Sequence, residues 1–169
     1  MDRDTKVCVS IAEKPGTFGV RFHNEGYILL GLNYVYIPLK VKAGQLGVVI
    51  ELVRANFHGC SISMPHKREA VKYVDRLEGV ASKIDAVNMI VREGETLVGY
   101  NTDYGGARKA IKSKIDIEGK RVVMIGAGGV ARAVGYAVRD LGGELDIASR
   151  DDEKSRDLAA FLEARAISY

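Results

Sequence analysis

Apolar positions in the first half of the chain alternate between short β-branched runs and longer stretches with helical spacing. The short runs predict strands, and the longer stretches place apolar side chains three and four positions apart, which is typical of amphipathic helices. The expected elements are, in chain order, a strand at 6–10, a helix at 22–30, a strand at 33–39, a helix at 45–56, a strand at 59–65 and a helix at 66–73. Because strands and helices alternate, we expect an α/β fold with a mostly parallel sheet.

The second half of the chain continues the pattern after a predicted β-hairpin. Apolar runs at 86–92 and 96–100 flank the turn residues Glu93-Gly94-Glu95, which predicts that hairpin. A helix at 104–115 is expected to connect two lobes, 1–104 and 105–169. The second lobe is expected to contain a strand at 120–125, a helix at 132–141, a strand at 145–148, a helix at 151–164 and the first residues of a third strand at 167–169.

The composition is that of an ordinary globular protein, with 47% hydrophobic and 28% charged residues among 169. A formal net charge of +3 without a basic run argues against nucleic acid as a partner. The longest apolar stretches fall short of the roughly 18 residues of a membrane span, and the polar start at 1–6 is no secretory signal. We therefore expect a cytoplasmic protein in which Cys8 and Cys60 are reduced and buried and no metal site is formed.

A glycine-rich turn follows the predicted strand at 120–125. Gly126-x-Gly128-x-x-Ala131 matches the dinucleotide-binding fingerprint, here between a strand and a helix. Gly126 permits the tight turn, and a side chain at Gly128 would keep the backbone away from the pyrophosphate, which binds at the helix N-terminus. The alternative is a glycine-rich turn that binds no ligand.

The strand that follows the fingerprint favours NADP over NAD. A NAD site places Asp or Glu about 20 residues beyond the glycines, where it binds the ribose 2′-hydroxyl. Ser149 and Arg150 stand there instead, and a guanidinium can bind a 2′-phosphate. Asp151 and Asp152 come next and would repel a phosphate, unless they instead form the cap and first turn of the following helix.

Two ionisable residues lie at the ends of predicted strands. Lys67 follows the strand at 59–65, and Asp103 closes the sequence Asn101-Thr102-Asp103. Open α/β sheets bind ligands at the carboxyl ends of their strands, and reduction of a ketone leaves an alkoxide that must be protonated. Lys67 and Asp103 can therefore form a proton-transfer pair. The alternatives are a solvated Lys67 at a helix N-terminus and, for the neighbouring His66, a packed neutral histidine.

These motifs, in this order, resemble those of the shikimate dehydrogenase family, and most closely its shikimate dehydrogenase-like subgroup. Residues 61–67 are similar to the family's Asn-Val-Thr-x-Pro-x-Lys, 86–88 to Ala-Val-Asn, 101–103 to Asn-Thr-Asp, 126–133 to Gly-Ala-Gly-Gly-x-x-Arg-Ala, and 149–150 to the start of Asn-Arg-Thr. The resemblance implies a substrate-binding domain over 1–104. It also implies the N-terminal half of a Rossmann-type NADP-binding domain, incomplete, over 105–169.

The resemblance also implies an activity, the NADPH-dependent reversible reduction of 3-dehydroshikimate to shikimate in chorismate and aromatic amino acid biosynthesis. Lys67 and Asp103 would be the catalytic residues. The implied substrate-binding residues are Thr17, Ser63, Lys67, Asn88 and Asp103. The implied cofactor-binding residues are Gly126, Ala127, Gly128, Gly129, Val130, Ala131, Ser149 and Arg150. The expected partner is a small shikimate- or quinate-like acid, and the oligomeric state stays open.

The chain departs from the family in two respects. Where the family has Ser-x-Ser-Pro, this chain retains one hydroxyl at Thr17 and has Gly19 and Val20 in place of the second serine and the proline. Loss of a hydroxyl donor to a carboxylate costs about 1–3 kcal/mol and would weaken or redirect substrate binding. The family's chain is also longer, so the alternatives are a non-catalytic remnant that binds such an acid, or a nucleotide-binding module without shikimate chemistry. An open half of a Rossmann sheet leaves an unpaired strand edge, which predicts self-association and poor solubility.

Overall fold

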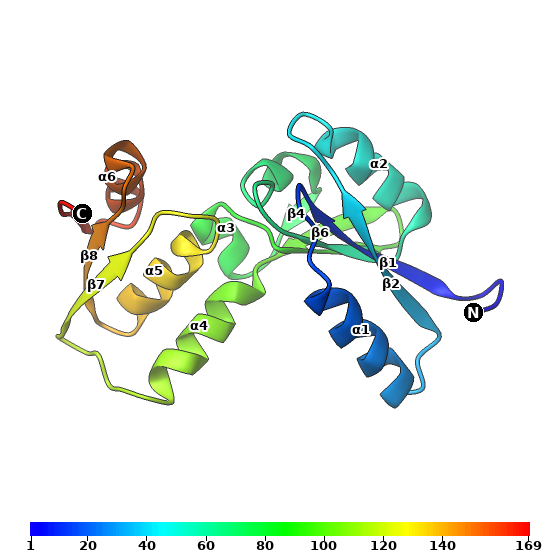
Figure 1. Ribbon diagram of the computed structural model, residues 1–169, viewed down its shortest axis with the longest axis horizontal. Helices are drawn as coiled ribbons and strands as arrows, with labels where there is room; N and C mark the ends of the chain where they lie inside the picture. The colour runs from blue at the N-terminus through cyan, green and yellow to red at the C-terminus, as the bar shows by residue number, and fades with distance from the viewer. The chain divides into compact units, whose positions relative to one another are not determined.

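The computed structural model describes residues 1–169, which divide into two units, Met1–Tyr100 and Asn101–Tyr169 (Figure 1). The sequence pattern indicates a boundary after residue 104, and the structural boundary lies earlier, directly after the strand that ends at Tyr100. The reason is that the helix beginning at Thr102 packs against another helix of the second unit, which its own periodicity does not reveal.

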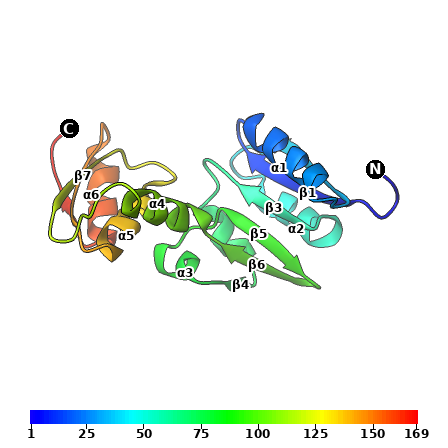
Figure 2. The same cartoon turned by 90° about the horizontal axis from the view of Figure 1, so that it is seen from below.

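The first unit contains one six-stranded sheet in the order β2-β1-β3-β5-β6-β4. Its elements are β1 (Lys6–Ala12), α1 (Phe18–Leu29), β2 (Tyr34–Lys40), α2 (Leu46–Asn56), β3 (Gly59–Ile62), the 3₁₀ helix η1 (Glu69–Tyr73), β4 (Arg76–Leu77), α3 (Val80–Ile84), β5 (Met89–Glu93) and β6 (Thr96–Tyr100). β1 pairs in parallel with β2 and β3, β4 pairs in parallel with β6, and β5 runs antiparallel between β3 and β6 (Figure 2). The predicted α/β fold with a mostly parallel sheet is confirmed.

Helix α2 supplies much of the core of the first unit. Leu46, Ile50 and Val53 follow the predicted helical spacing and are fully buried. They pack in one cluster with side chains of the central strands β1 and β3, among them Ile11 and Ile62. Burial of an aliphatic side chain of this size stabilises a fold by about 1.5–3 kcal/mol. This cluster holds the carboxyl ends of β1 and β3, which carry the candidate site.

Helix α1 is held to the edge strand β2 by the side chain of Asn24 and by ring contacts of His23 with Tyr36 and of Tyr27 with Tyr34. Asn24 Nδ2 donates to the carbonyl oxygens of Val20 and Tyr36, both at 2.8 Å, and Asn24 Oδ1 accepts from the Tyr36 amide at 2.9 Å. No residue of α1 is fully buried. Because β2 is at the sheet edge, Pro38 fits within it without removing an interior ladder bond.

The hairpin predicted around Gly94 is confirmed. Glu93 pairs with Thr96, so only Gly94 and Glu95 form the turn between β5 and β6. Gly94 has a φ of +63°, which is the conformation that a type II′ turn requires at its first central position and that glycine adopts without strain. The hairpin therefore fixes the register of β5, which begins immediately after Asn88.

The second unit contains a three-stranded parallel sheet in the order β7-β8-β9. Its elements are α4 (Thr102–Lys112), β7 (Arg121–Ile125), α5 (Ala131–Asp140), β8 (Glu144–Ala148), α6 (Asp152–Phe161) and β9 (Arg165–Ala166). Leu145 and Ile147 pack with side chains of α5 and α6 in one core. Val123 and Ile125 of β7 are 53% and 73% exposed, because their side chains point to the face of the sheet opposite this core.

Several boundaries differ from those expected. The helix expected at 66–73 is only the 3₁₀ helix η1, because residues before it form a turn in which the His66 amide donates to the Ser63 carbonyl. The third strand of the second unit lies at Arg165–Ala166 and not at 167–169, since Arg165 pairs with Asp146 in the ladder. Helix α1 begins at Phe18 and not at residue 22, with Thr17 at its N-cap position. The short elements β4 and α3 were not predicted, because they contain too few residues to show a periodic spacing of apolar side chains.

Cys8 and Cys60 are free thiols on adjacent strands. Cys60 pairs in register with Val9, so the two side chains leave opposite faces of the sheet. Cys60 is buried as expected, whereas Cys8 is only half-buried. None of the helices combines the length and the apolar character that crossing a bilayer would require.

Candidate functional site

Three of the predicted substrate residues lie at one edge of the first sheet. Main-chain hydrogen bonds hold their segments together: the Ser63 amide donates to the Ile11 carbonyl, the Val87 amide to the Lys67 carbonyl, and the Ile62 amide to the Asn88 carbonyl, each at 2.8 Å. These bonds join the carboxyl ends of β1 and β3 to the residue that precedes β5. Ser63, Lys67 and Asn88 are therefore gathered where open α/β sheets bind ligands.

Lys67 is 8% exposed, so the alternative of a solvated surface lysine is wrong. The preceding His66 is fully buried, and its Nε2 lies 2.8 Å from the Val41 carbonyl oxygen. Because a carbonyl only accepts, His66 Nε2 carries the hydrogen, and the prediction that His66 is a packed core residue is confirmed. A lysine ammonium is rarely buried to this extent in a protein unless it is paired or takes part in chemistry.

Thr17 and Asp103 lie at the N-terminal ends of two helices. Thr17 is exposed at the N-cap position of α1, and its hydroxyl makes no hydrogen bond within the protein. Asp103 is half-buried in the first turn of α4, in the second unit, where its amide donates to Asn101 Oδ1 at 3.1 Å. Asn101 is thus the N-cap of α4, and a carboxylate in that first turn is favoured by the helix dipole. The pairing of Asp103 with Lys67 stays a prediction.

The second unit contains a hollow of about 340 Å³ at the carboxyl ends of β7 and β8. Of the predicted cofactor residues, five line it: Gly126, Ala127, Gly128, Ser149 and Arg150. The other three, Gly129, Val130 and Ala131, do not line the hollow; they lead into α5 and form its first residues. Ile125 and Tyr169 complete the wall together with Asp151, the N-cap of α6, and Lys154 in the first turn of that helix.

The glycine turn leaves open space in this hollow. Gly126 has a φ of +112°, which side chains rarely adopt, and its amide donates to the Ala148 carbonyl at 2.7 Å. A Cβ atom on Gly128 would meet no atom within 4 Å. Helix α5 begins directly after the turn without a side-chain cap. Unpaired amides at such a helix start attract an anion, so the residues present fit a dinucleotide pyrophosphate.

The other wall of the hollow is formed by the turn between β8 and α6. Asp151 caps α6, because its Oδ1 accepts from the Lys154 amide at 3.1 Å, so the alternative in which it begins the helix is confirmed. Asp151 Oδ2 lies 2.7 Å from Lys154 Nζ, and this ammonium lowers the pKa of Asp151. Lys154 lines the hollow but was not among the cofactor-binding residues predicted from the sequence. The sequence feature that could have identified it is its position in the first turn of the helix that follows Arg150.

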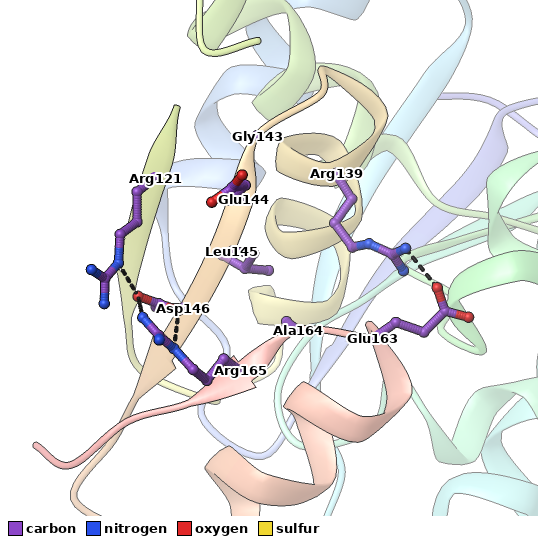
Figure 3. Close-up of a pocket in the computed structure, with 9 residues that line it drawn as sticks. All are labelled: Arg121, Arg139, Gly143, Glu144, Leu145, Asp146, Glu163, Ala164 and Arg165. Carbon is purple, nitrogen blue, oxygen red and sulfur yellow. Dashed lines mark hydrogen bonds and ion pairs between the residues drawn. The ribbon is translucent and has the colours of Figure 1, made fainter. Parts of the chain in front are cut away.

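A second hollow of the same unit, of about 460 Å³, lies at the amino ends of the strands (Figure 3). Asp146 is 4% exposed and accepts hydrogen bonds from Arg121 Nε at 2.6 Å and from Arg165 Nε and Nη2 at 2.9 and 2.7 Å. Arg139 pairs with Glu163 across the hollow. The three arginines are balanced by three carboxylates, Glu144 among them, so this hollow offers no net charge to a ligand. We assign it a structural role.

No group of three or more His, Cys, Asp or Glu side chains is arranged to hold a metal ion. Apart from the carboxylates of Asp103 and Asp151, the polar side chains at the candidate sites are amides, hydroxyls and ammonium or guanidinium groups. These groups suit an oxygen-rich anionic ligand, because they donate hydrogen bonds to hydroxyl, carboxylate and phosphate oxygens.

Most of this chain is similar to known proteins of one family. Residues 17–90 match the family model of the shikimate dehydrogenase substrate binding domain. The shikimate dehydrogenase (NADP(+)) of Carboxydothermus hydrogenoformans is 39% identical over 145 residues, which cover 85% of this chain and 52% of that protein. The shikimate dehydrogenase-like protein of Haemophilus influenzae is 35% identical over 162 residues, covering 95% of this chain and 59% of that protein.

A solved structure shows the same fold. The shikimate 5-dehydrogenase of Thermus thermophilus, in complex with NADP(H) and shikimate, superposes with a TM-score of 0.85 at 27% identity, covering 96% of this chain and 62% of that one. This chain spans about half the length of the curated relatives it matches.

Proposed function

Because the chain belongs to the shikimate dehydrogenase family, we propose that it serves the NADPH-dependent, reversible reduction of 3-dehydroshikimate to shikimate, a step of chorismate and aromatic amino acid biosynthesis. One observation carries the proposal. Ser63, the buried Lys67 and Asn88 meet at one sheet edge, all within the range that matches the substrate-binding family model. The first unit is then the substrate-binding domain, and the second is the N-terminal half of a Rossmann-type nucleotide domain.

The proposed roles follow from the donor groups. The Thr17 and Ser63 hydroxyls and the Asn88 amide donate to the carboxylate and hydroxyl oxygens of the substrate. The Lys67 ammonium donates a proton to the oxygen of the ketone as it becomes an alkoxide. Asp103 orients that ammonium and accepts a hydrogen bond from a ring hydroxyl. Since Gly19 provides no hydroxyl, the carboxylate is bound by fewer donors here than in the family pattern.

The residues around the glycine turn would hold NADP. NADPH, when bound, supplies the hydride for the reduction. Gly126 and Gly128 let the backbone approach the pyrophosphate, and the amides at the start of α5 donate to it. The guanidinium of Arg150 lies in the same hollow and can bind a ribose 2′-phosphate.

Replacement of one lysine tests the proposal. NADP⁺-dependent oxidation of shikimate is followed by the absorbance of the reduced nicotinamide. Lys67→Gln is expected to lower kcat by at least about 100-fold with little change in KM, because it removes the acidic proton and keeps a polar group that can still donate a hydrogen bond to the substrate. Lys72→Gln, at an exposed lysine of η1, is the matched control and should stay within about twofold of the native rate. Equal rates for both variants would contradict the assignment of Lys67.

A second candidate function is binding of a shikimate- or quinate-like acid without turnover. The observation that favours it is that Ser63, Lys67 and Asn88 all lie in the first unit, whereas the nucleotide hollow lies in the second. Isothermal titration with shikimate separates the two functions. Binding that is weakened by Asn88→Ala, without turnover at saturating NADP⁺, would favour the binding protein.

A further inference from the structure

The turn between β8 and α6 places opposite charges side by side in the nucleotide hollow. Arg150, Asp151 and Lys154 all line it. Arg150 is exposed and makes no ion pair, whereas Lys154 Nζ lies 2.7 Å from Asp151 Oδ2. One of the two cations available to a phosphate is therefore already engaged by a carboxylate of the same hollow.

Asp151 is fixed in this position by its backbone as well as by its side chain. Its Oδ1 caps α6, and Ser149 Oγ accepts from the Asp151 amide at 3.2 Å and donates to the Asp151 carbonyl at 2.6 Å. Ser149 is itself buried. Because turning away would break the helix cap, the carboxylate stays at the wall of the hollow. The Lys154 ammonium lowers the pKa of Asp151, so the carboxylate is ionised at neutral pH.

We propose that Asp151 is a specificity-determining residue that narrows the preference for NADP over NAD by engaging Lys154 and repelling a ribose 2′-phosphate. A phosphate monoester carries about −1.5 to −2 charges at neutral pH, so an adjacent carboxylate opposes its binding. The same carboxylate does not repel the unphosphorylated nucleotide, because a ribose 2′-hydroxyl carries no charge. This inference rests on the proposed nucleotide function of the hollow.

Two nucleotides that differ only in the 2′-phosphate test the proposal. Titration calorimetry of the native chain with 2′,5′-ADP and with 5′-AMP measures the contribution of that group without any catalytic step. Asp151→Asn keeps the helix cap, since Asn and Asp cap equally well, and removes the charge. It is expected to raise the affinity for 2′,5′-ADP about tenfold and to change that for 5′-AMP by less than about twofold.

Two further variants show whether the effect runs through Lys154. As a single variant, Lys154→Gln should change the affinity for 2′,5′-ADP little, because Asp151 already engages the ammonium. Combined with Asp151→Asn, it should remove most of the increase in affinity that Asp151→Asn causes alone. Asp152→Asn removes the same charge at the next residue, which does not line the hollow, and is the matched control.

The outcomes separate this inference from the function on which it rests. Binding of both nucleotides with a ratio that Asp151→Asn leaves unchanged would overturn the role of Asp151 alone. An equal gain from Asp152→Asn would do the same, since the effect would then be one of general charge. Binding of neither nucleotide by any variant would overturn the nucleotide assignment together with it.

Discussion

The carboxylate of Asp146 ties three strands of the second unit together. It lies on the central strand β8 and accepts hydrogen bonds from Arg165 on β9 and Arg121 on β7 (Figure 3). The hydrogen bonds from these two guanidinium groups lower the pKa of Asp146 from 3.8 to about 2. Asp146 therefore fixes the register of the strands whose opposite ends carry the nucleotide hollow.

This ion-pair network predicts a pH dependence of stability. Because the pKa of Asp146 is lower in the folded chain, its contribution is present above about pH 4 and is lost as the pH falls through about 2. Asp146→Asn should lower the urea midpoint of unfolding at neutral pH, and its difference from the native chain should shrink over that acid range. Asp157→Asn, on the exposed side of α6, is the control. A difference that is independent of pH would contradict the assignment.

Two glycines of the same turn should respond differently to one added methyl group. Gly126→Ala places a side chain at a φ of +112° and is expected to destabilise the second unit by about 1–3 kcal/mol. Gly128→Ala adds a Cβ in open space, so the fold should be unaffected, while affinity for 2′,5′-ADP falls because the backbone approach is blocked. Urea unfolding and nucleotide titration measure the two effects. Equal loss of stability in both variants would argue against this division of roles.

At the scale of elements, α1 contacts β2 through the hydrogen bonds of Asn24 and through two pairs of aromatic rings, and none of its residues is fully buried. Asn24→Ala removes both bonds to Tyr36 and should leave main-chain groups of β2 unpaired, at a cost of about 1–3 kcal/mol. Amide hydrogen exchange should then rise throughout α1 and change little in α2. Glu25→Ala, at the exposed neighbouring position, is the control. Exchange in α1 that is equal in the two variants would show that other contacts hold the helix.

Elements with a regular spacing of apolar residues could be predicted from the sequence, whereas elements that depend on polar contacts between distant residues could not. The stripe of α2 and the turn at Gly94 each indicate their structure locally. By contrast, the turn around the buried His66 is determined by the Val41 carbonyl, which is distant in the chain. The bonds of Asn24 to β2 are equally non-local.

The candidate sites follow the same division. The glycine fingerprint identifies most of the nucleotide hollow, because its residues are neighbours in sequence and its function depends on their missing side chains. Lys154 was missed, since its role depends on the turn that brings the first helical turn back to Arg150. Lys67 is likewise held by a contact distant in the chain, the Val87 amide that donates to its carbonyl, and its burial has no local signature in the sequence.

At the scale of the whole molecule, most of the residues proposed to bind the two ligands lie in different units. The matched substrate residues Ser63, Lys67 and Asn88 belong to the first unit, and the glycine turn and Arg150 belong to the second. Each unit has its own apolar core. Asp103 is the exception, since it is a proposed substrate residue in the second unit. For the other residues, a variant in one unit provides the control for ligand binding to the other unit.

The exposed apolar surface of the chain predicts self-association. Phe18 and Phe22 are 81% and 64% exposed on α1, with their rings stacked at 6.0 Å, and Leu29 of the same helix is 85% exposed. Residues 18, 22 and 29 fall on one stripe of the helix, which also carries Glu25 between residues 22 and 29. Monomeric proteins seldom expose such a patch, and we expect the sedimentation coefficient to rise with protein concentration.

Substitution on that stripe tests the cause of the association. The double variant Phe18→Ser, Phe22→Ser should raise the dissociation constant of the self-associated species at least about tenfold, because burial of one aromatic side chain stabilises an interface by about 1.5–3 kcal/mol. Val48→Ser, at a 79% exposed position of α2, removes an apolar group elsewhere and should leave the constant nearly unchanged. A native chain that sediments as a monomer at every concentration would refute the expectation. An equal effect of Val48→Ser would show that association does not depend on α1.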